Sequence, residues 1–216
     1  MPEREQNRYF YGWTIVLVST LALLVSNGLS IVGIPVFYKF IQADLVASGA
    51  VAKENIQSVY GIAPAFTTLL AGFFAPVAGY LLSRLDSRKM MIIGCAILGS
   101  GLALYSQSTS AAMVFASHAL LGIVLGFVGV LVNTVLISNW FTRRRGLALG
   151  IVLTGTSFGG AVIPQISTPL IERYGWRSAL LLVSLVVWLV LLPAVIFFVK
   201  NRPEEIGASA DGDEIS

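Results

Sequence analysis

Six long runs without Asp, Glu, Lys or Arg divide this sequence, and they limit its fold more than any other feature. The 14 basic and 11 acidic residues all lie in the seven segments that flank or connect these runs. Each run is long enough to cross the roughly 30 Å hydrocarbon core of a bilayer as a helix. Because lipid offers no hydrogen bonds to exposed backbone, the pattern predicts an all-α membrane protein. The six expected transmembrane helices cover residues 13–38, 57–82, 90–106, 112–138, 146–168 and 178–199.

The connecting segments predict the domain organisation and the orientation. We expect an N-terminal tail at 1–12, a six-helix bundle at 13–200, and a second tail or the start of an interdomain linker at 201–216. Ten of the 14 basic residues fall on the side of the membrane that holds both ends of the chain. Basic loops favour the cytoplasm, so both termini are predicted to be cytoplasmic in a plasma (inner) membrane.

Composition excludes several classes of function. With 56% hydrophobic and 12% charged residues, the chain is expected to have the lipid bilayer as its surroundings. Its basic residues sit between apolar runs, which indicates topology charge and no nucleic-acid partner. Cys95 is the single cysteine and lies in an apolar run, which rules out an intrachain disulfide and a Cys-rich metal cluster. We predict no metal and no cofactor.

The sequence contains an internal repeat. The segment SRLDSR at 83–88 follows the second run, and ERYGWR at 172–177 follows the fifth run, 89 residues later. Each lies between the second and third helices of a three-helix unit, but the two lie on opposite sides of the membrane. Two three-helix units related by inverted topology are a known plan of transporters.

Small and polar residues recur at helical spacing in four of the six runs. Such a stripe faces protein or water, whereas the third and sixth runs lack one and are expected to face lipid. The hypothesis is that the polar members line a substrate pathway. The alternative is that each only bonds a neighbouring helix, for about 0.6 kcal/mol. The pathway candidates are Ser26, Asn27, Ser30, His118, Asn133, Thr154, Ser157 and Gln165, and the helix-packing candidates are Gly122, Gly126, Gly150, Gly155 and Gly159.

His118 is the only ionisable side chain within these runs. An ordinary imidazole has a pKa of about 6.5, so this side chain would be able to take a charge and pair with an anion or relay a proton. The alternative is a neutral ring that bonds a carbonyl or a water near the surface. The sequence leaves both interpretations open.

Several motifs resemble those of the major facilitator superfamily. The stretch GYLLSRLDSRK at 79–89 resembles its loop signature between helices 2 and 3, with Ser83 at the usual aspartate and Asp86 at the usual glycine. HALLG at 118–122 resembles the helix-4 signature, with His118 at the usual arginine. The monocarboxylate transporter and oxalate:formate antiporter branch is indicated by YGW at 11–13, WFTRRRGLALG at 140–150, YGWR at 174–177 and RPEEIG at 202–207.

The resemblance implies the N-terminal half of a twelve-helix secondary transporter, which moves a small organic anion such as a mono- or dicarboxylate by alternating access. It also implies a proton or a counter-anion as coupling partner and a second six-helix half, from the same gene, another chain or a second copy. Because the runs carry no Lys or Arg, the fixed cation for the anion is expected in that other half. The cytoplasmic gating loop would include Gly79, Arg84, Asp86, Arg88 and Lys89, with plain topology charge as the alternative.

Two other classes of function have to be compared with transport. GTSFG at 155–159 matches the G-x-S-x-G string of serine hydrolases, but it lies inside an apolar helix, where no strand-to-helix elbow is expected. We therefore predict that the chain is not an enzyme. The remaining alternative is a membrane scaffold or partner subunit that transports nothing itself.

Overall fold

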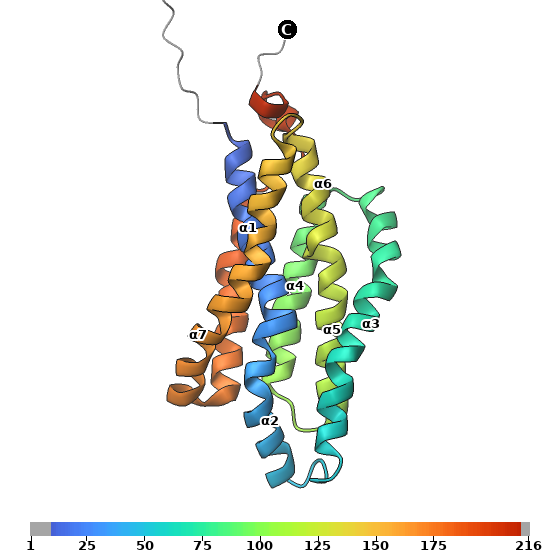
Figure 1. The fold of residues 1–216 in the computed structure, drawn as a ribbon, viewed down its shortest axis with the longest axis vertical. Helices are drawn as coiled ribbons and strands as arrows, with labels where there is room; N and C mark the ends of the chain where they lie inside the picture. Colours follow the sequence, from blue (N-terminus) through green and yellow to red (C-terminus); the bar gives the residue numbers. More distant parts are fainter. Residues whose placement is uncertain (1–9, 213–216) are drawn as a thin grey trace, which may run out of the picture.

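The computed structural model describes residues 10–212, and all regular elements within that range are helical. Residues 1–9 and 213–216, which belong to the two predicted tails, lie outside the described residues. Figure 1 shows a bundle of long rods with both described ends of the chain at its upper end, called here the termini end; the lower end is the far end. The elements are α1 (Gly12–Asn27), η1 (Gly28–Gly33), α2 (Pro35–Ala47), α3 (Ile56–Leu82), α4 (Ser87–Ser106), α5 (Ala111–Val128), α6 (Val130–Trp140), α7 (Arg145–Val186), η2 (Val187–Leu191), α8 (Leu192–Phe198), η3 (Pro203–Ile206) and η4 (Ala210–Gly212).

Within the described range, five helical stretches are long and apolar enough to cross a membrane, and the last, Arg145–Phe198, has 54 residues. The sequence predicted six helices. The difference lies at Gly175, whose φ of 78° and ψ of 158° interrupt this stretch. A positive φ favours glycine, which has no Cβ. Figure 1 shows the chain running to the far end in a first leg, residues 145–174, and turning back in a return leg, residues 176–198. The chain therefore makes six crossings, as predicted.

The first helix is longer than predicted, and its path changes before a proline. It continues through η1 and α2 to Ala47, although the uncharged run ends at residue 38. Both π-helical segments, η1 and η2, end two residues before a proline, Pro35 or Pro193, in the first turn of the next helix. Proline has no N–H and its ring crowds the carbonyl four residues earlier, so a wider turn before it relieves the clash.

The fourth crossing is interrupted where the sequence predicted a continuous helix. Gly129 has an extended backbone, with ψ of −162°, and separates α5 from α6. A Cβ at this position would collide with the carbonyl oxygen of Leu125. The side-chain amide of Asn133 donates to the carbonyls of Val128 and Gly129, at 2.8 and 2.9 Å. The Asn133 side chain thus satisfies carbonyls at a helix end that lipid could not hydrate.

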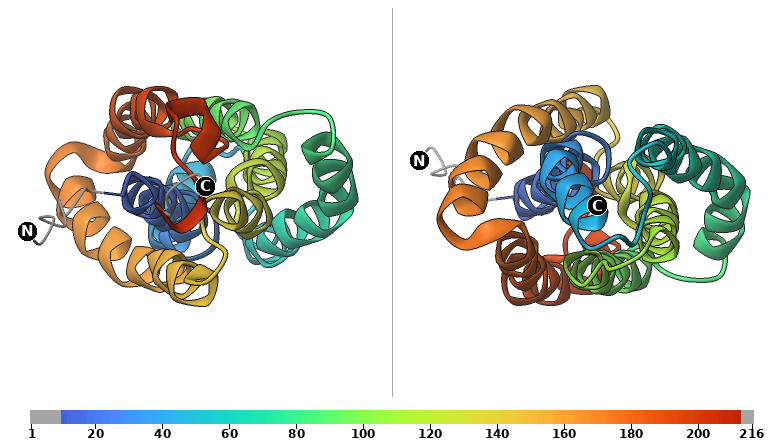
Figure 2. Two further views of the ribbon diagram at one scale, coloured as in Figure 1. Left: turned by 90° about the horizontal axis from the view of Figure 1, so that it is seen from above. Right: turned by 90° about the horizontal axis from the view of Figure 1, so that it is seen from below.

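The views along the bundle show how the crossings are arranged (Figure 2). The first crossing lies near the centre, with α3 and the first leg of α7 on opposite flanks. The return leg and α4 lie together on one side. Only 11% of the most apolar 18-residue stretch of α3 is buried inside the bundle, compared with 61% of that of α1–η1. The α3 helix therefore exposes more of its surface than the first crossing does.

The expectation that the third helix faces lipid is wrong in part. In α4, 56% of the most apolar window is buried within the bundle. Three glycines on α4 allow this, because a Cβ at Gly94, Gly99 or Gly101 would touch Phe127, Trp188 or Leu120, respectively. The expectation relied on the absence of a polar stripe in the third run. Helices can also pack closely at glycine, and this needs no polar side chain.

A very close helix contact joins the first crossing to the first leg of α7. A Cβ at Gly155 would collide with the carbonyl oxygen of Thr20, and one at Gly159 would collide with that of Leu24 and with Gly28. Without a hydrophobic force between helices in lipid, such close van der Waals packing is a main source of association. Gly150, on the same helix, is exposed, and a Cβ added there would have no other atom within 4 Å.

We predict that Gly155→Ala destabilises the bundle by about 1–3 kcal/mol, because the added methyl group must displace the backbone of the first crossing. The matched variant Gly150→Ala is expected to leave stability unchanged or raise it slightly through helix propensity. Thermal unfolding in detergent, followed by circular dichroism, measures both. Equal melting temperatures for the two variants would contradict the packing described here.

Candidate functional site

A buried polar cluster surrounds His118 near the far end. Only 1% of the His118 residue surface is exposed. Its Nδ1 lies 2.8 Å from Oγ1 of Thr67 on α3. Its Nε2 lies 3.3 Å from the hydroxyl of Tyr38 on α2 and 3.2 Å from that of Tyr105 on α4. The ring of Tyr60 lies 4.8 Å from that of Tyr38 and completes the cluster. Four crossings therefore meet at one imidazole.

The hydrogen bonds favour one tautomer of this histidine. The Thr67 hydroxyl has a single hydrogen, and the carbonyl oxygen of His118 lies 3.0 Å away as an acceptor. If Thr67 donates to that carbonyl, Nδ1–H donates to Thr67 and the single lone pair of Nε2 accepts from Tyr38 or Tyr105. This assignment satisfies the most donors, so we assign the proton of the neutral ring to Nδ1. The partners are side-chain hydroxyls, whereas the sequence analysis considered a carbonyl or a water near the surface.

A second polar group lies along the first crossing and α6. Ser26, Asn27, Ser30 and Asn133 are all buried. Asn27 donates to Oγ1 of Thr156 at 3.2 Å, which links the first crossing to the first leg of α7. Within the described residues, the hydroxyls of Ser26 and Ser30 and the Oδ1 atoms of Asn27 and Asn133 have no hydrogen-bond partner. We call these four residues the polar seam. Buried polar atoms usually have partners, so the seam has bonding capacity that the protein does not use.

The remaining pathway candidates lie on the surface. Thr154, Ser157 and Gln165 are exposed on the first leg of α7, and the Thr154 hydroxyl donates to the Ile151 carbonyl of its own helix. The eight predicted residues therefore fall into three groups: the His118 cluster, the polar seam and this exposed row. The bond from Asn27 to Thr156 connects the seam with the helix that carries the row.

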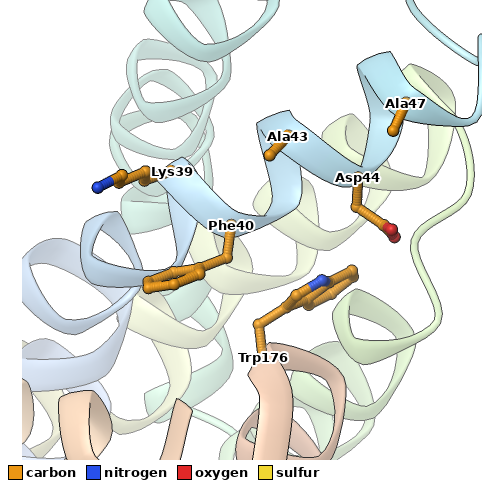
Figure 3. A pocket seen from close by; sticks show the side chains of 6 residues that line it. All are labelled: Lys39, Phe40, Ala43, Asp44, Ala47 and Trp176. Carbon is orange, nitrogen blue, oxygen red and sulfur yellow. The ribbon is translucent and has the colours of Figure 1, made fainter. Parts of the chain in front are cut away.

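A shallow pocket of about 400 Å³ lies elsewhere, at the far end (Figure 3). Figure 3 shows Phe40 and Asp44 of α2 facing Trp176, while Lys39 points away. None of the eight predicted pathway residues lines it. The pocket lacks a buried polar group and we assign it no role. Among residues 10–212, no group of three or more His, Cys, Asp or Glu side chains is arranged to hold a metal ion.

The predicted gating loop lies at the termini end, and its basic residues differ in their contacts. Lys89 forms an ion pair with Asp86 at 3.2 Å, and the Arg84 guanidinium lies over the Tyr80 ring at 5.4 Å. Both contacts are exposed and leave the charges accessible. The Arg88 guanidinium points instead to the carbonyl of Ile196 in α8. Gly79 is exposed with open space around it.

The segment after the return leg folds back onto the bundle. The carboxylate of Asp211 accepts from the backbone N–H groups of Thr142, Arg143 and Arg144, at 3.0, 2.7 and 3.4 Å. Burial alone would raise the pKa of Asp211, but these three donors and the charge of Arg143 outweigh it and hold the pKa below 3.8. The sequence analysis expected only a tail or linker here and missed this cap on the α6–α7 turn.

Sequence reasoning also missed the partners of His118. Tyr38, Tyr60 and Tyr105 lie within about two to three turns of the far ends of their helices, as His118 does. Side chains at the same depth in an antiparallel bundle can meet, so depth was the signal that could have found them. The sequence does not tell which helices are neighbours, and this decides which of these side chains touch.

The six crossings, with two inverted groups of three helices and polar residues inside the bundle, define this chain as one half of a helical transporter fold. Its fold resembles a solved bacterial homologue of the human lysosomal transporter Spinster, in an inward-facing and unoccupied conformation. The TM-score is 0.57 at 15% identity, and the match covers 98% of this chain and 46% of the other.

The family model of the Major Facilitator Superfamily matches residues 12–215, and the chain belongs to this superfamily. Similar relatives include the riboflavin transporter RibJ of Trypanosoma brucei brucei, 26% identical over 94% of this chain and 36% of the transporter. Monocarboxylate transporter 13 of Rattus norvegicus is 31% identical over 81% of this chain and 39% of its own length. The chain spans less than half the length of these relatives, which is consistent with the N-terminal half predicted from the sequence.

These relatives confirm the prediction that the chain is not an enzyme, since they are transporters. The hydrolase motif also has the wrong setting. Ser157 lies within the helical first leg of α7, and His118 is bonded to Thr67 in another part of the bundle. A nucleophile elbow requires a sharp turn between a strand and a helix.

We predict that Thr67→Val destabilises the chain by about 1–3 kcal/mol, because it leaves Nδ1 of the buried His118 without a partner. Thr68→Val is the matched control: Thr68 is exposed, and its hydroxyl bonds the Pro64 carbonyl in its own helix. Unfolding in detergent measures both variants. If Thr67→Val is as stable as Thr68→Val, the His118 cluster contributes nothing to stability.

We predict that Asp211 stabilises the turn in a pH-dependent way. Its pKa is depressed in the folded chain, so its contribution is complete well above pH 3.8 and declines as the pH falls through the lower folded-state value. Asp211→Asn should therefore melt below the wild type at neutral pH, and the difference should shrink as the pH falls below 3.8. Glu204→Gln, at an exposed carboxylate of the same segment, should show no such difference. A gap that stays constant over this pH range would overturn the assignment.

Proposed function

We propose that this chain forms the N-terminal half of a secondary transporter that moves a small organic anion, such as a mono- or dicarboxylate, by alternating access. The unpartnered atoms of the polar seam carry this proposal. A buried oxygen without a hydrogen bond is costly in a bilayer, and a polar solute or water moving past the seam would satisfy it. Similarity to monocarboxylate transporters supports the substrate class.

The pathway in this proposal combines the seam with the exposed row. Thr154, Ser157 and Gln165 present hydroxyl and amide groups on an open face of the first leg of α7. The seam is joined to that leg by the bond from Asn27 to Thr156. A second six-helix half, from the same gene, another chain or another copy, would cover this face and enclose the solute between the halves. Inverted-repeat transporters bind substrates at such a midplane interface.

Open faces on two helices support the second half as partner. Gly61, Gly72 and Gly79 of α3 have no atom within 4 Å of a Cβ position, and Gly146 and Gly150 of α7 are equally open. At these glycine positions no side chain protrudes, which allows another helix bundle to approach closely and to slide. The gating loop would then act at the termini end, where Arg84, Asp86 and Lys89 keep accessible charges for groups of the second half.

The proposal includes the membrane and the coupling. We assign the termini end to the cytoplasm of a plasma (inner) membrane, because basic segments gather there. A proton or a counter-anion would be the coupling ion. The fixed cation that holds a carboxylate would come from the second half, since the six predicted runs contain no Lys or Arg.

Uptake into proteoliposomes tests this function. The chain is reconstituted together with a second six-helix half, and the entry of labelled lactate, formate, oxalate and riboflavin is measured. We expect uptake of at least one carboxylate and none of riboflavin. Riboflavin uptake alone would replace the substrate class, and no flux of any solute would favour the scaffold alternative. Carboxylate flux by the isolated chain at the rate of a full-length transporter would refute the proposal that the second half supplies the fixed cation.

The pathway has its own variant. Ser157→Leu replaces a hydroxyl of the exposed row with a bulky apolar group and should reduce carboxylate uptake by about tenfold or more, through lost hydrogen bonding and steric blockage. Ser100→Leu is the matched control, at an exposed serine on α4, outside the proposed pathway. Initial rates at equal protein content compare the two. Equal uptake by both variants would remove Ser157 from the pathway.

A further inference from the structure

At the far end, an arginine at the start of the return leg joins three helices. Nη1 of Arg177 donates to the carbonyl of Ser106 and Nη2 to that of Ser108, both at 3.1 Å. Nη2 also forms an ion pair with Asp44 of α2 at 2.6 Å. The guanidinium lies 4.3 Å from the centre of the Trp176 ring. We call this set of contacts the far-end clamp: the start of the return leg is fastened to the ends of α4 and α2.

At the termini end, an arginine at the start of α4 binds the end of the return leg. Nη2 of Arg88 donates to the carbonyl of Ile196, in the last turn of α8. The backbone N–H of Arg88 donates to Oδ1 of Asn201 at 2.8 Å. Asn139, near the end of α6, donates to the Asn201 carbonyl at 3.1 Å. In this termini-end clamp, the start of α4 is fastened to the end of the return leg and to the end of α6.

Both arginines meet groups that a helix end leaves without partners. The last carbonyls of a helix accept no hydrogen bond from within it, and a cation is favourable beside them. The planar guanidinium carries five N–H donors and can serve two or three acceptors at once, whereas a lysine ammonium acts as a compact charge. The Arg177 guanidinium serves three acceptors in this way, whereas that of Arg88 serves the Ile196 carbonyl.

Between the clamps, α4 and the return leg are in close contact. Ser184 donates its hydroxyl to the Gly99 carbonyl at 2.8 Å. A Cβ at Gly99 would collide with the indole of Trp188. The two helices are thus held at the middle and at both ends, and we call the pair the wall.

The two arginines occupy equivalent positions of the internal repeat, 89 residues apart. We propose that Arg88 and Arg177 are reciprocal positioning residues: each begins one helix of the wall and binds the carbonyl end of the other, so that the wall moves as one body. The wall then keeps its internal arrangement while the open faces of α3 and the first leg of α7 slide against a partner. This inference concerns the helix ends and does not depend on the substrate.

Cysteine accessibility tests the proposal end by end. In a Cys95→Ala background, Ser108→Cys reports on the far end and Val199→Cys on the termini end, since both native residues are fully buried. Arg177→Gln should raise the maleimide labelling rate of residue 108 by about tenfold or more and leave residue 199 unchanged. Arg88→Gln should do the reverse. Its effect should be smaller, because Nε of Arg88 has no partner among the described residues.

Matched control variants distinguish the loss of a clamp contact from the loss of a positive charge. Arg173→Gln and Arg84→Gln each remove an arginine four residues from a clamp arginine. The Arg173 guanidinium lies over the Tyr174 ring and that of Arg84 over the Tyr80 ring, so both reporters should label at the wild-type rate. Labelling that rises at both ends in Arg177→Gln or Arg88→Gln indicates general loss of stability and overturns the proposal. Rates equal to the controls overturn it too.

The lysine variants keep the test valid if a glutamine variant does not fold. Arg177→Lys retains the charge but cannot serve the three acceptors at once, whereas Arg88→Lys can still donate to the single Ile196 carbonyl. Arg177→Lys should label several-fold faster than the wild type at residue 108 only, and Arg88→Lys should label near the wild-type rate at both ends. A wild-type rate at residue 108 in Arg177→Lys would show that positive charge alone suffices, which contradicts the clamp. Because labelling does not involve transport, its outcome is separate from that of the uptake experiments.

Discussion

Backbone groups inside a bilayer have no water to bond, and the structure meets this constraint at several points where a helix deviates from regular geometry. The wider turns of η1 and η2 stand before Pro35 and Pro193, where an α-helical turn would clash. The interruption at Gly129 is covered by the side chain of Asn133. At the helix ends, Arg88 and Arg177 supply the donors. Each of these irregularities is therefore accompanied by a specific polar partner or by proline.

The glycines of the bundle lie on two kinds of helix surface, close contacts between helices and open outer faces. Where the first crossing meets the first leg of α7, glycines let the backbones touch, and where α4 meets the return leg, Gly99 makes room for the indole of Trp188. On α3 and the outer side of the first leg, glycines face open space instead. The same residue type thus serves a rigid interior contact and an open sliding surface. In a rocking transporter, both are needed in one half.

The polar residues follow a similar division, and here prediction from sequence was incomplete. Helical spacing grouped His118 with Asn133 and the serines of the first run, because all occupy stripes that avoid lipid. In the structure both nitrogens of His118 are bonded, and the Tyr60 hydroxyl beside it has no partner among the residues described, like the oxygens of the seam around Ser26 and Asn133. Periodicity gives the face of a helix that a side chain occupies. It does not give the neighbour on that face, which decides whether a polar atom is already satisfied.

The sequence by itself determined the membrane class, the six crossings, the repeat and the superfamily, because these depend on local hydrophobicity, charge position and motifs. Even Gly175, which turns one long helix into two crossings, lies in a segment whose charges marked it as a turn. Only the tertiary structure decided that α4 is an interior wall, that the segment after the return leg caps the α6–α7 turn through Asp211, and that Arg88 points into its own half. Each of these depends on helix ends and glycine faces meeting across long sequence separations, and no periodic pattern within one segment records such a meeting.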